Sequence, residues 1–557
     1  MQVPLEHAKS KLQPFAIDAF LDKRMNLMQA IQRNFLPLGR SDFTALRQSD
    51  AIYIDKTDLI CRLCREPSRI FLSRPRRFGK SLLVSTFESL FQNGLRDFSG
   101  LSIEKVWSDR SYPVVRLDFS GLKNQKSKQE FQTALQSLVA SAFAPVGFQF
   151  DSSDSTVLFI DQFKSWLNTL QPNSIVLLID EYDTPLTSHI DNGELFEQIR
   201  NVMSEFYAAI KQYEGCLRFF FMTGITRFSN TSIFSDFNLF EDISFDPDFG
   251  TLLGITEEEL ERYFDDYLKD AEAALGLTRS ELLEELRTYY DGFSFDSEAE
   301  THVFCPWSVL NFLNRPKRGF QNYWYGTGGQ ASVLLNYLKG HALSSPDAFN
   351  KPMSITMDEL QAARSYKEIA LNALLTQAGY LTIKSKLNMA EVELGYPNKE
   401  VELSMARLYA DEMLRNVNRL DVGVSTLGRL LDTESPETVV AHFNRVLNAI
   451  DYQRYPIRDE ATTRSHIQVL LMGGAMLPDV EKHSALGRSD LEVMTPHRVW
   501  VFEFKFATLS KDVEKLLEEA VSQMKTKRYG ETPHGKALLR AALVFDAEKR
   551  RFAAALA

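Results

Sequence analysis

The residues with the clearest chemical potential are a glycine, a lysine and a serine in succession, Gly79-Lys80-Ser81. They follow an apolar run at residues 70–72 and an arginine-rich loop, and they begin an expected helix at residues 81–91. Backbone amides at a helix N-terminus favour bound anions. A lysine and a hydroxyl at this point suit a phosphate group and its Mg²⁺ ion, so the pattern predicts a phosphate-binding loop.

The loop departs from the common G-x-x-x-x-G-K-[ST] pattern, because its first position is Arg74. In the expected site, Lys80 neutralises the β and γ phosphates of a nucleotide and Ser81 ligates Mg²⁺. The rest of the loop is expected to contact the same nucleotide through Arg76, Arg77, Phe78 and Gly79. A Gly-Lys-Ser tripeptide alone is a weak signal, since it occurs by chance in many chains.

Two acidic residues, Asp180 and Glu181, follow an apolar run at residues 174–179. Ligands bind at the carboxyl ends of strands in open α/β sheets, so the pair is expected beside the phosphate loop. We expect Asp180 to hold Mg²⁺ through water and Glu181 to orient or deprotonate the attacking water. The alternative is a buried strand with a solvated acidic loop. The two motifs together favour a site for ATP and Mg²⁺.

A further apolar run, at residues 218–222, ends in polar residues. Thr223 or Thr226 could sense the γ-phosphate from a neighbouring strand, and Arg227 could stabilise the charge that is transferred. Their alternative role is only to begin a turn.

A second group of ionisable residues lies near the C-terminus. Glu503 and Lys505 are two apart in an expected strand and therefore share a face. A turn around Pro496 would bring Asp490 beside them. Two converging carboxylates suit Mg²⁺, and a neighbouring lysine can position or activate water for cutting a phosphodiester. Glu481 could complete this metal site.

An E-x-K pattern on a strand is often only a solvent-facing salt pair. Here residues 491–494 and 500–506 are too apolar for exposed strands, which favours a buried sheet. Lys525, Lys527 and Arg528 could contact a phosphate backbone, although such a run is more often a solvated helix end.

The elements that must position these groups change along the chain. From Asp42 to Gly254 strands alternate with helices, which predicts a mostly parallel sheet covered on both faces. The next region is predominantly helical, and Thr256 with Glu259 has the form of a capping box. Strands return near the C-terminus with a helix between the last two, at residues 491–494, 499–504 and 542–545.

Size and composition set further limits. A chain of 557 residues is too long for one core, so about two to four domains are expected. The net charge of −11 argues against a generally basic nucleic-acid binder, though not against a local basic groove. No apolar run is long enough to span a bilayer, and no secretory signal is expected. Cys61 and Cys64 form a lone C-x-x-C, so free thiols in a reducing cytoplasm are favoured over zinc.

These residues resemble a family of bacterial AAA-ATPase-like proteins that carry a PD-(D/E)XK domain behind the ATPase. The loop at residues 73–81 resembles the family's R-P-R-R-F-G-K-S loop, in which the missing first glycine is normal. The other similar segments are Tyr53-Ile54-Asp55-Lys56-Thr57, Asp180-Glu181-Tyr182-Asp183, Gly224-Ile225-Thr226-Arg227-Phe228-Ser229, Tyr290-Asp291-Gly292-Phe293, Tyr323-Trp324 with Thr327-Gly328, Gly379-Tyr380-Leu381-Thr382 and Tyr396-Pro397-Asn398-Lys399-Glu400-Val401.

The resemblance covers the chain from about residue 40 to its end and implies an ATP-binding domain related to the AAA and STAND classes. It also implies a nuclease signature made of G-R-x-D at residues 487–490, E-F-K at residues 503–505, and a helix followed by Tyr529 that carries Gln523. The expected α/β architecture has a P-loop parallel sheet, a helical middle region and a C-terminal nuclease-like domain. The expected parts are an N-terminal helical extension, an ATPase domain, a helical lid or connector and the nuclease-like domain, at residues 1–38, 39–255, 256–415 and 416–557.

We therefore expect an ATP-binding and ATP-hydrolysing cytoplasmic protein, coupled to a Mg²⁺-dependent nuclease that acts on nucleic acid, with DNA as the first expectation. AAA-like domains often assemble, so Arg227 or Arg76 could act across the subunits of a homo-oligomer. The alternative is an ATP-dependent switch whose C-terminal fold binds DNA or a partner without cutting. A P-loop phosphotransferase is disfavoured by the large helical middle region and the second acidic site.

Overall fold

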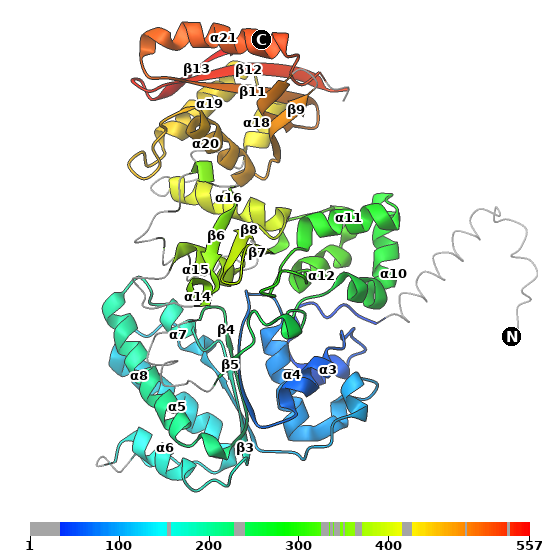
Figure 1. Cartoon of the computed structure of the whole chain (residues 1–557), viewed down its shortest axis with the longest axis vertical. Coiled ribbons are helices and arrows are strands. Elements are labelled where there is room, and N and C mark those ends of the chain that lie inside the picture. The colour runs from blue at the N-terminus through cyan, green and yellow to red at the C-terminus, as the bar shows by residue number, and fades with distance from the viewer. Residues whose placement is uncertain are drawn as a thin grey trace, which may run out of the picture.

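The computed structural model describes residues 34–152, 157–227, 240–324, 334, 338, 343, 346–348, 351–361, 370–414, 426–484, 487–531 and 535–557. Most of the expected N-terminal extension lies outside these residues, as do Phe228, Ser229, Thr327 and Gly328 of the quoted motifs. Figure 1 shows the parallel sheet at one end of the molecule and the C-terminal sheet at the other, with the middle region between them.

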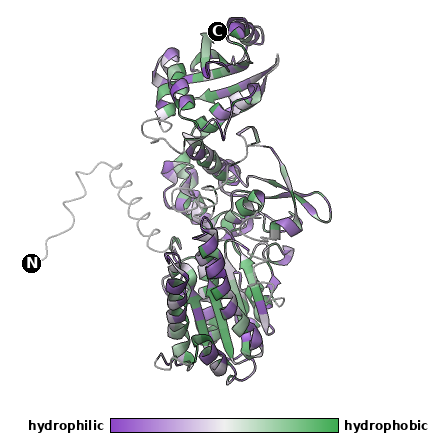
Figure 2. Ribbon diagram, turned by 90° about the vertical axis from the view of Figure 1, so that its left-hand side faces the viewer, coloured by the Kyte–Doolittle hydropathy of each residue, from purple (hydrophilic) through white to green (hydrophobic). Residues whose placement is uncertain are grey.

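A five-stranded parallel sheet forms the core of the N-terminal part, in the order β2-β3-β4-β1-β5. Its strands, in chain order, are Ser68–Ser73 (β1), Val114–Asp118 (β2), Ile175–Asp180 (β3), Leu217–Gly224 (β4) and Glu241–Asp242 (β5). Strands β3 and β4 are buried along their whole length, as expected for strands covered on both faces. Figure 2 shows their hydrophobic character. The predicted parallel sheet is confirmed.

Helices cover this sheet on both sides (Figure 1). One side carries Phe43–Arg47 (α2), Thr57–Cys64 (α3) and Lys80–Asn93 (α4), and the other carries Lys128–Phe143 (α5), Phe159–Leu167 (α6) and Gly193–Gln212 (α8), with the short helix Thr184–Thr187 (α7). Ser127 and Asn192 cap α5 and α8 by accepting hydrogen bonds from backbone amides. Among the described helices, none combines the length and the apolar character that crossing a membrane requires.

The middle region is helical, as predicted, and begins with Glu257–Leu275 (α10), Arg279–Tyr290 (α11) and Pro306–Asn314 (α12). Thr256 and Glu259 form the predicted capping box at the start of α10. The region also contains an antiparallel sheet of order β6-β8-β7 that the sequence analysis did not predict. Its strands are only four or five residues long, although β8 alternates polar and apolar residues: Met353–Thr356 (β6), Thr382–Lys386 (β7) and Glu391–Gly395 (β8). Three helices accompany them, namely Met357–Gln361 (α14), Leu371–Ala378 (α15) and Lys399–Met413 (α16).

The C-terminal part is a mixed five-stranded sheet of order β13-β12-β11-β10-β9. Its strands are Pro478–Ser484 (β9), Gly487–Met494 (β10), Arg498–Ala507 (β11), Ala537–Asp546 (β12) and Arg551–Leu556 (β13). Only the β11–β12 pair is parallel, and the helix Val513–Thr526 (α21) makes the crossover that such a pair needs. Three helices precede the sheet: Leu427–Thr433 (α18), Pro436–Asn448 (α19) and Glu460–Gly473 (α20). The predicted α/β class of this part is confirmed.

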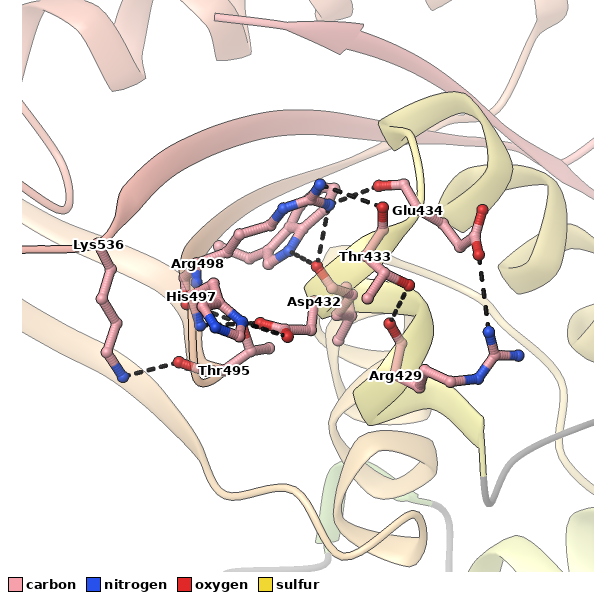
Figure 3. Close-up of polar contacts among 10 residues, drawn as sticks. Arg429, Asp432, Thr433, Glu434, Thr495, His497, Arg498 and Lys536 are labelled. Carbon is pink, nitrogen blue, oxygen red and sulfur yellow. Dashed lines mark hydrogen bonds and ion pairs between the residues drawn. The ribbon is translucent and has the colours of Figure 1, made fainter.

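The tip of the β10–β11 hairpin is attached to α18 through Asp432 (Figure 3). The Asp432 carboxylate accepts hydrogen bonds from the Thr495 hydroxyl at 2.6 Å and from the backbone N–H of His497 at 2.9 Å. The hydroxyl of Thr495 and the ring and backbone nitrogens of His497 hold the pKa of Asp432 at about 2. The hairpin is therefore closed against the helix by an ionised carboxylate.

Two side chains of β11 complete this attachment at the C-terminal end of α18, and Figure 3 labels one of them, Arg498. The Arg498 guanidinium donates to the carbonyl oxygens of Thr433 and Glu434, and the Trp500 indole donates to that of Leu431 at 2.7 Å. A helix C-terminus leaves such carbonyls without partners inside the helix, so these donors stabilise the end of α18.

Candidate nucleotide and metal sites

The phosphate loop runs from the end of β1 to the start of α4. Gly79 precedes α4 with φ of 90°, a left-handed conformation that favours glycine. Arg77 also has positive φ, 72°, which is uncommon outside glycine and concentrates at functional sites. Residues 76–83 line one side of a cavity of about 670 Å³.

The ammonium group of Lys80 is buried inside this loop. Its Nζ donates hydrogen bonds to the carbonyl oxygens of Arg74 and Pro75, both at 2.9 Å. Burial lowers the pKa of Lys80 to about 8, although the acids of the Asp180-Glu181-Tyr182-Asp183 segment oppose this shift. The loop therefore holds a positive charge that its own backbone carbonyls stabilise.

Arg74 occupies the position of the first glycine in the common phosphate-loop pattern. Its buried guanidinium donates to the carbonyl oxygens of Ser73 at 2.9 Å, Ser244 at 2.6 Å and Phe249 at 3.3 Å. The same group lies 4.3 Å from the ring centre of Phe295. Burial lowers its pKa to about 9. These contacts anchor the loop to the chain that follows β5, which a glycine could not do.

Asp180 ends β3 beside the start of α4. Burial raises its pKa, while the hydroxyl of Ser81 and the ammonium of Lys80 favour the charged form. The Oδ1 atom of Asp180 is buried and accepts no hydrogen bond. An unpaired carboxylate oxygen next to a serine hydroxyl is the hard oxygen donor set that Mg²⁺ prefers, so these residues fit the ion.

Glu181 lines the same cavity as the phosphate loop. It has positive φ, 52°, and its Oε2 accepts a hydrogen bond from the Thr184 hydroxyl at 3.1 Å. Burial first, and the nearby Asp183 carboxylate second, raise the pKa of Glu181. A carboxylate with a raised pKa beside a phosphate site can accept a proton from water. The acid pair and the loop therefore lie side by side at one edge of the sheet.

The polar residues at the tip of β4 do not line this cavity. Thr223 donates its hydroxyl to a backbone carbonyl of β1 at 2.7 Å, and Thr226 donates its hydroxyl to Asp183 at 2.6 Å. Arg227 forms an ion pair with Asp242 at 2.9 Å. These groups have protein partners in the structure, and the expectation that they face a γ-phosphate stays a prediction. The geometry favours the alternative, in which the two threonines shape a turn.

Asp183 is a residue that the sequence analysis quoted without a role. Its buried carboxylate also accepts from the backbone N–H groups of Ile225 and Thr226, at 3.2 and 2.8 Å. A Cβ atom on Gly224 would lie 2.4 Å from the same carboxylate, so only glycine fits there. Asp183 thus joins the ends of β3 and β4. The sequence signal for this role is a third acidic residue after Asp180 and Glu181.

The remaining walls of the cavity are largely apolar, which suits the flat faces of a purine. The indole ring of Trp307 is one of them, and its centre lies 4.3 Å from the guanidinium carbon of Arg77. No base-contacting residue could be predicted from sequence, since the apolar side chains of this wall come from separated segments: Ile52, Ile54, Leu252, Leu253, Ile255, Phe264 and Leu310.

The second site lies on β10 and β11. Lys505 Nζ is 3.2 Å from Glu503 Oε1, so these side chains share a face of β11. Asp490 accepts a hydrogen bond from the backbone N–H of Phe504 at 2.8 Å, which places it beside Glu503. The Oε2 atom of Glu503 is buried without a hydrogen-bond partner. Burial, reinforced by Asp490, raises the pKa of Glu503 to about 7. These carboxylates fit one Mg²⁺ ion.

Glu481, the third carboxylate suggested for this metal site, is paired with arginine side chains in the structure. Its carboxylate forms ion pairs with Arg464 at 2.6 Å and Arg488 at 2.8 Å, and the hydrogen bond from Arg464 lowers its pKa. Within the part of the chain that the structure describes, no group of three or more His, Cys, Asp or Glu side chains is arranged to hold a metal ion. The suggestion that Glu481 is a ligand stays a prediction, and two arginines compete for its oxygens.

Glu460 is the residue of this site that the sequence analysis missed. It is the first residue of α20, and its carboxylate lies 3.4 Å from Lys505 Nζ. Lys505 therefore lies between Glu460 and Glu503. Asp459 and Thr462 form a capping box at the same helix start, which was a signal for the helix but not for its contact with β11.

The basic residues expected at a phosphate backbone lie at the C-terminal end of α21. Lys525 is in the last turn of the helix, and the Lys527 side chain packs against Gly487, where a Cβ atom would lie 3.2 Å from it. Arg528 forms an ion pair with Glu531. Gln523 and Tyr529, both quoted as part of the nuclease signature, are joined by a hydrogen bond of 3.3 Å.

Comparison with known proteins places both sites in described families. Residues 37–234 match a family described as "Predicted AAA-ATPase", and residues 460–554 match the PD-(D/E)XK nuclease superfamily. A protein of Azotobacter chroococcum mcd 1, described as "Uncharacterized protein in vnfD 5'region", is 29% identical over 517 residues, which cover 90% of this chain and 94% of that protein. The resemblance drawn from the motifs is confirmed for both regions.

Proposed function

Since the chain carries an AAA-ATPase-like domain and a PD-(D/E)XK nuclease superfamily domain, we propose that it binds and hydrolyses ATP and that the nucleotide controls a Mg²⁺-dependent nuclease acting on DNA. The first half is supported by one observation above all. The phosphate loop and Glu181 line one cavity, beside which Asp180 keeps a buried oxygen without a partner.

In the proposed nucleotide complex, Lys80 exchanges its two loop carbonyls for the β and γ phosphates. The backbone amides at the start of α4 donate to the same phosphate oxygens. Ser81 and Asp180 would hold Mg²⁺, which supplies positive charge to those oxygens when bound. Glu181 orients the attacking water and accepts its proton, a role that its raised pKa supports.

In the proposed nuclease site, Asp490 and Glu503 would hold Mg²⁺, which supplies a Lewis acid for the scissile phosphate when bound. Burial disfavours the charged form of Lys505, but the carboxylates of Glu503 and Glu460 outweigh it and raise the pKa of Lys505. Lys505 therefore stays protonated, and it orients the attacking water and stabilises phosphate charge rather than acting as a base.

ATP hydrolysis and DNA cleavage test the two halves separately. ATP turnover is measured for wild type and Lys80→Ala, with and without single-stranded and double-stranded DNA. Lys515→Ala is the control, because this lysine is 79% exposed on α21. Hydrolysis by Lys80→Ala at the wild-type rate would refute the assignment of the phosphate loop. Cleavage is measured with Glu503→Ala and Lys505→Ala, and cleavage that survives both changes would remove the second site from the mechanism.

A second candidate function is a nucleotide-dependent switch whose C-terminal domain binds DNA without cutting it. Glu481 forms ion pairs with two arginines, so Asp490 and Glu503 are the carboxylates left to hold a metal ion. A site with fewer metal ligands favours this alternative. DNA that is bound but not cleaved in the presence of Mg²⁺, with ATP hydrolysis intact, would select the switch over the nuclease.

A further inference from the structure

Helix α16 lies between the nucleotide-binding part of the molecule and the C-terminal sheet (Figure 1). We propose that α16, anchored by the buried carboxylate of Glu400 and packed along α20, transmits the nucleotide state of the phosphate loop to the Glu460–Lys505–Glu503 group. This inference rests on the proposed function, and it gives that function a specific path from the wall of the nucleotide cavity through α16 and α20 to the second site.

The path begins at the wall of the nucleotide cavity. Trp307 lines the cavity, its ring contacts the Arg77 guanidinium, and its indole N–H donates to the Tyr323 carbonyl at 3.3 Å. The next residue, Ser308, donates its hydroxyl to Glu400 Oε2 at 2.6 Å. If Arg77 moves on nucleotide binding, it therefore shifts Trp307 and the adjacent Ser308. Ser308 is a hydrogen-bond donor to Glu400 in α16.

Glu400 is the junction of this path. It lies in the first turn of α16 and is 1% exposed. Its Oε1 accepts hydrogen bonds from the backbone N–H groups of Tyr323 and Trp324, at 2.6 and 2.8 Å. A buried carboxylate that has donors from two separate segments fixes their relative position, because losing any one donor leaves a buried charge undersatisfied.

A second contact reaches the same junction from the phosphate loop itself. Gly379 has φ of 88°, and a Cβ atom on it would lie 2.8 Å from Pro75 Cβ and 3.5 Å from the Trp324 ring. The Trp324 ring also packs edge-on against Tyr380, with centres 5.0 Å apart. The loop that must move around a phosphate is therefore packed against Gly379, which in turn lies against the Trp324 ring. Glu400 accepts a hydrogen bond from the backbone N–H of Trp324.

The path leaves α16 through its packing on α20. Gly473 is the last residue of α20, and a Cβ atom on it would lie 2.8 Å from Ala410 Cβ of α16. The two helices can approach this closely only at glycine. The other end of α20 carries Glu460, which contacts Lys505, and the following turn carries Arg464, which pairs with Glu481. A rigid shift of α20 therefore changes the position of the nuclease group.

Hydrogen–deuterium exchange on the full chain tests the relay without requiring cleavage. Exchange in α20 and β11 is compared for the protein alone and with Mg²⁺ and a non-hydrolysable ATP analogue. In wild type the nucleotide should change the exchange rates in α20 several-fold. Gly473→Ala should bind the analogue with wild-type affinity but lose most of this response, because its added methyl separates α16 from α20.

Gly428→Ala is the matched control, since it adds the same methyl to a helix where the nearest atom would be Met476 Sδ at 3.8 Å. Glu400→Gln, which keeps the volume and removes the charge, is the second variant if Gly473→Ala does not fold, and it should also reduce the response. A wild type that binds nucleotide without any change in α20, or a Gly473→Ala protein that responds as wild type does, overturns the relay alone. A wild type that binds no nucleotide overturns the relay together with the proposed function.

Discussion

Lys80 Nζ lies 2.9 Å from the carbonyl oxygen of Arg74, so the lysine expected to bind phosphate is hydrogen-bonded to its own loop. Lys80→Ala removes a buried ammonium that phosphate would bind, and charged hydrogen bonds of this kind are worth about 1.5–3 kcal/mol each. We therefore expect an affinity for Mg²⁺-ATP that is about 10- to 100-fold lower, by titration with a fluorescent analogue. Unchanged affinity would contradict the role of Lys80.

Arg74→Gly restores the common loop pattern and is nevertheless expected to damage the protein. It removes donors to three backbone carbonyls and the contact with Phe295, which together should cost about 2–4 kcal/mol of unfolding free energy. Urea unfolding measures this loss. Arg74→Lys should recover only part of it, because a lysine cannot reproduce the planar set of donors. A glycine variant as stable as wild type would show that the anchor is dispensable.

Glu400 gives a pH dependence of stability with a definite sign. Burial raises its pKa from 4.5 to about 7, so the folded state binds its proton more tightly than the unfolded state does. Proton binding by Glu400 therefore adds about 3 kcal/mol to the free energy of unfolding below pH 4.5, and this contribution is lost as the pH rises to about 7. The neighbouring Cys305, with a pKa raised to about 12 by burial, and Tyr290, whose pKa burial also raises, do not titrate in this window.

The measurement is the difference in unfolding free energy between wild type and Glu400→Gln at several pH values, in which the other titrating groups cancel. Wild type should lose stability relative to the variant between pH 4.5 and 7. A difference that is independent of pH would show that Glu400 keeps an ordinary pKa.

Glu503 and Lys505 should separate metal binding from cleavage. Glu503→Gln removes one of the two carboxylates of the site, so calorimetry should show at least about tenfold weaker Mn²⁺ or Mg²⁺ binding. Lys505→Met leaves both carboxylates in place and should still bind the metal while cleaving far more slowly. Glu519→Gln, at an exposed position on α21, is the control. If Lys505→Met loses metal binding, the role of Lys505 is instead to hold the two carboxylates in position.

The attachment of the β10–β11 hairpin should weaken at low pH. Hydrogen bonds from Thr495 and His497 lower the pKa of Asp432 from 3.8 to about 2, so the stability they provide is present above pH 3.8 and is lost as the pH falls towards 2. Asp432→Asn should remove this dependence and accelerate amide exchange at the hairpin tip. Exchange that matches wild type at neutral pH would mean that Arg498 and Trp500 hold the hairpin without the carboxylate.

The features that could be predicted from the sequence are those formed by residues adjacent in the chain. A strand, an arginine-rich loop and Gly79-Lys80-Ser81 at a helix start define the phosphate loop, and an apolar run ending in Asp180 defines its partner strand. The two-residue spacing of Glu503 and Lys505 placed both on one face, because the side chains of a strand alternate. Local order and periodicity also predicted the parallel sheet and the capping box of α10.

The partners of those side chains became known from the folded structure. Thr226 and Arg227 are engaged by Asp183 and Asp242, while Glu481 is engaged by two arginines. The contact of Glu460 with Lys505 and the walls of the nucleotide cavity likewise join segments far apart in the chain. No local pattern encodes such contacts, because they depend on how separately formed elements pack. The relation between the two sites through α16 is of the same kind.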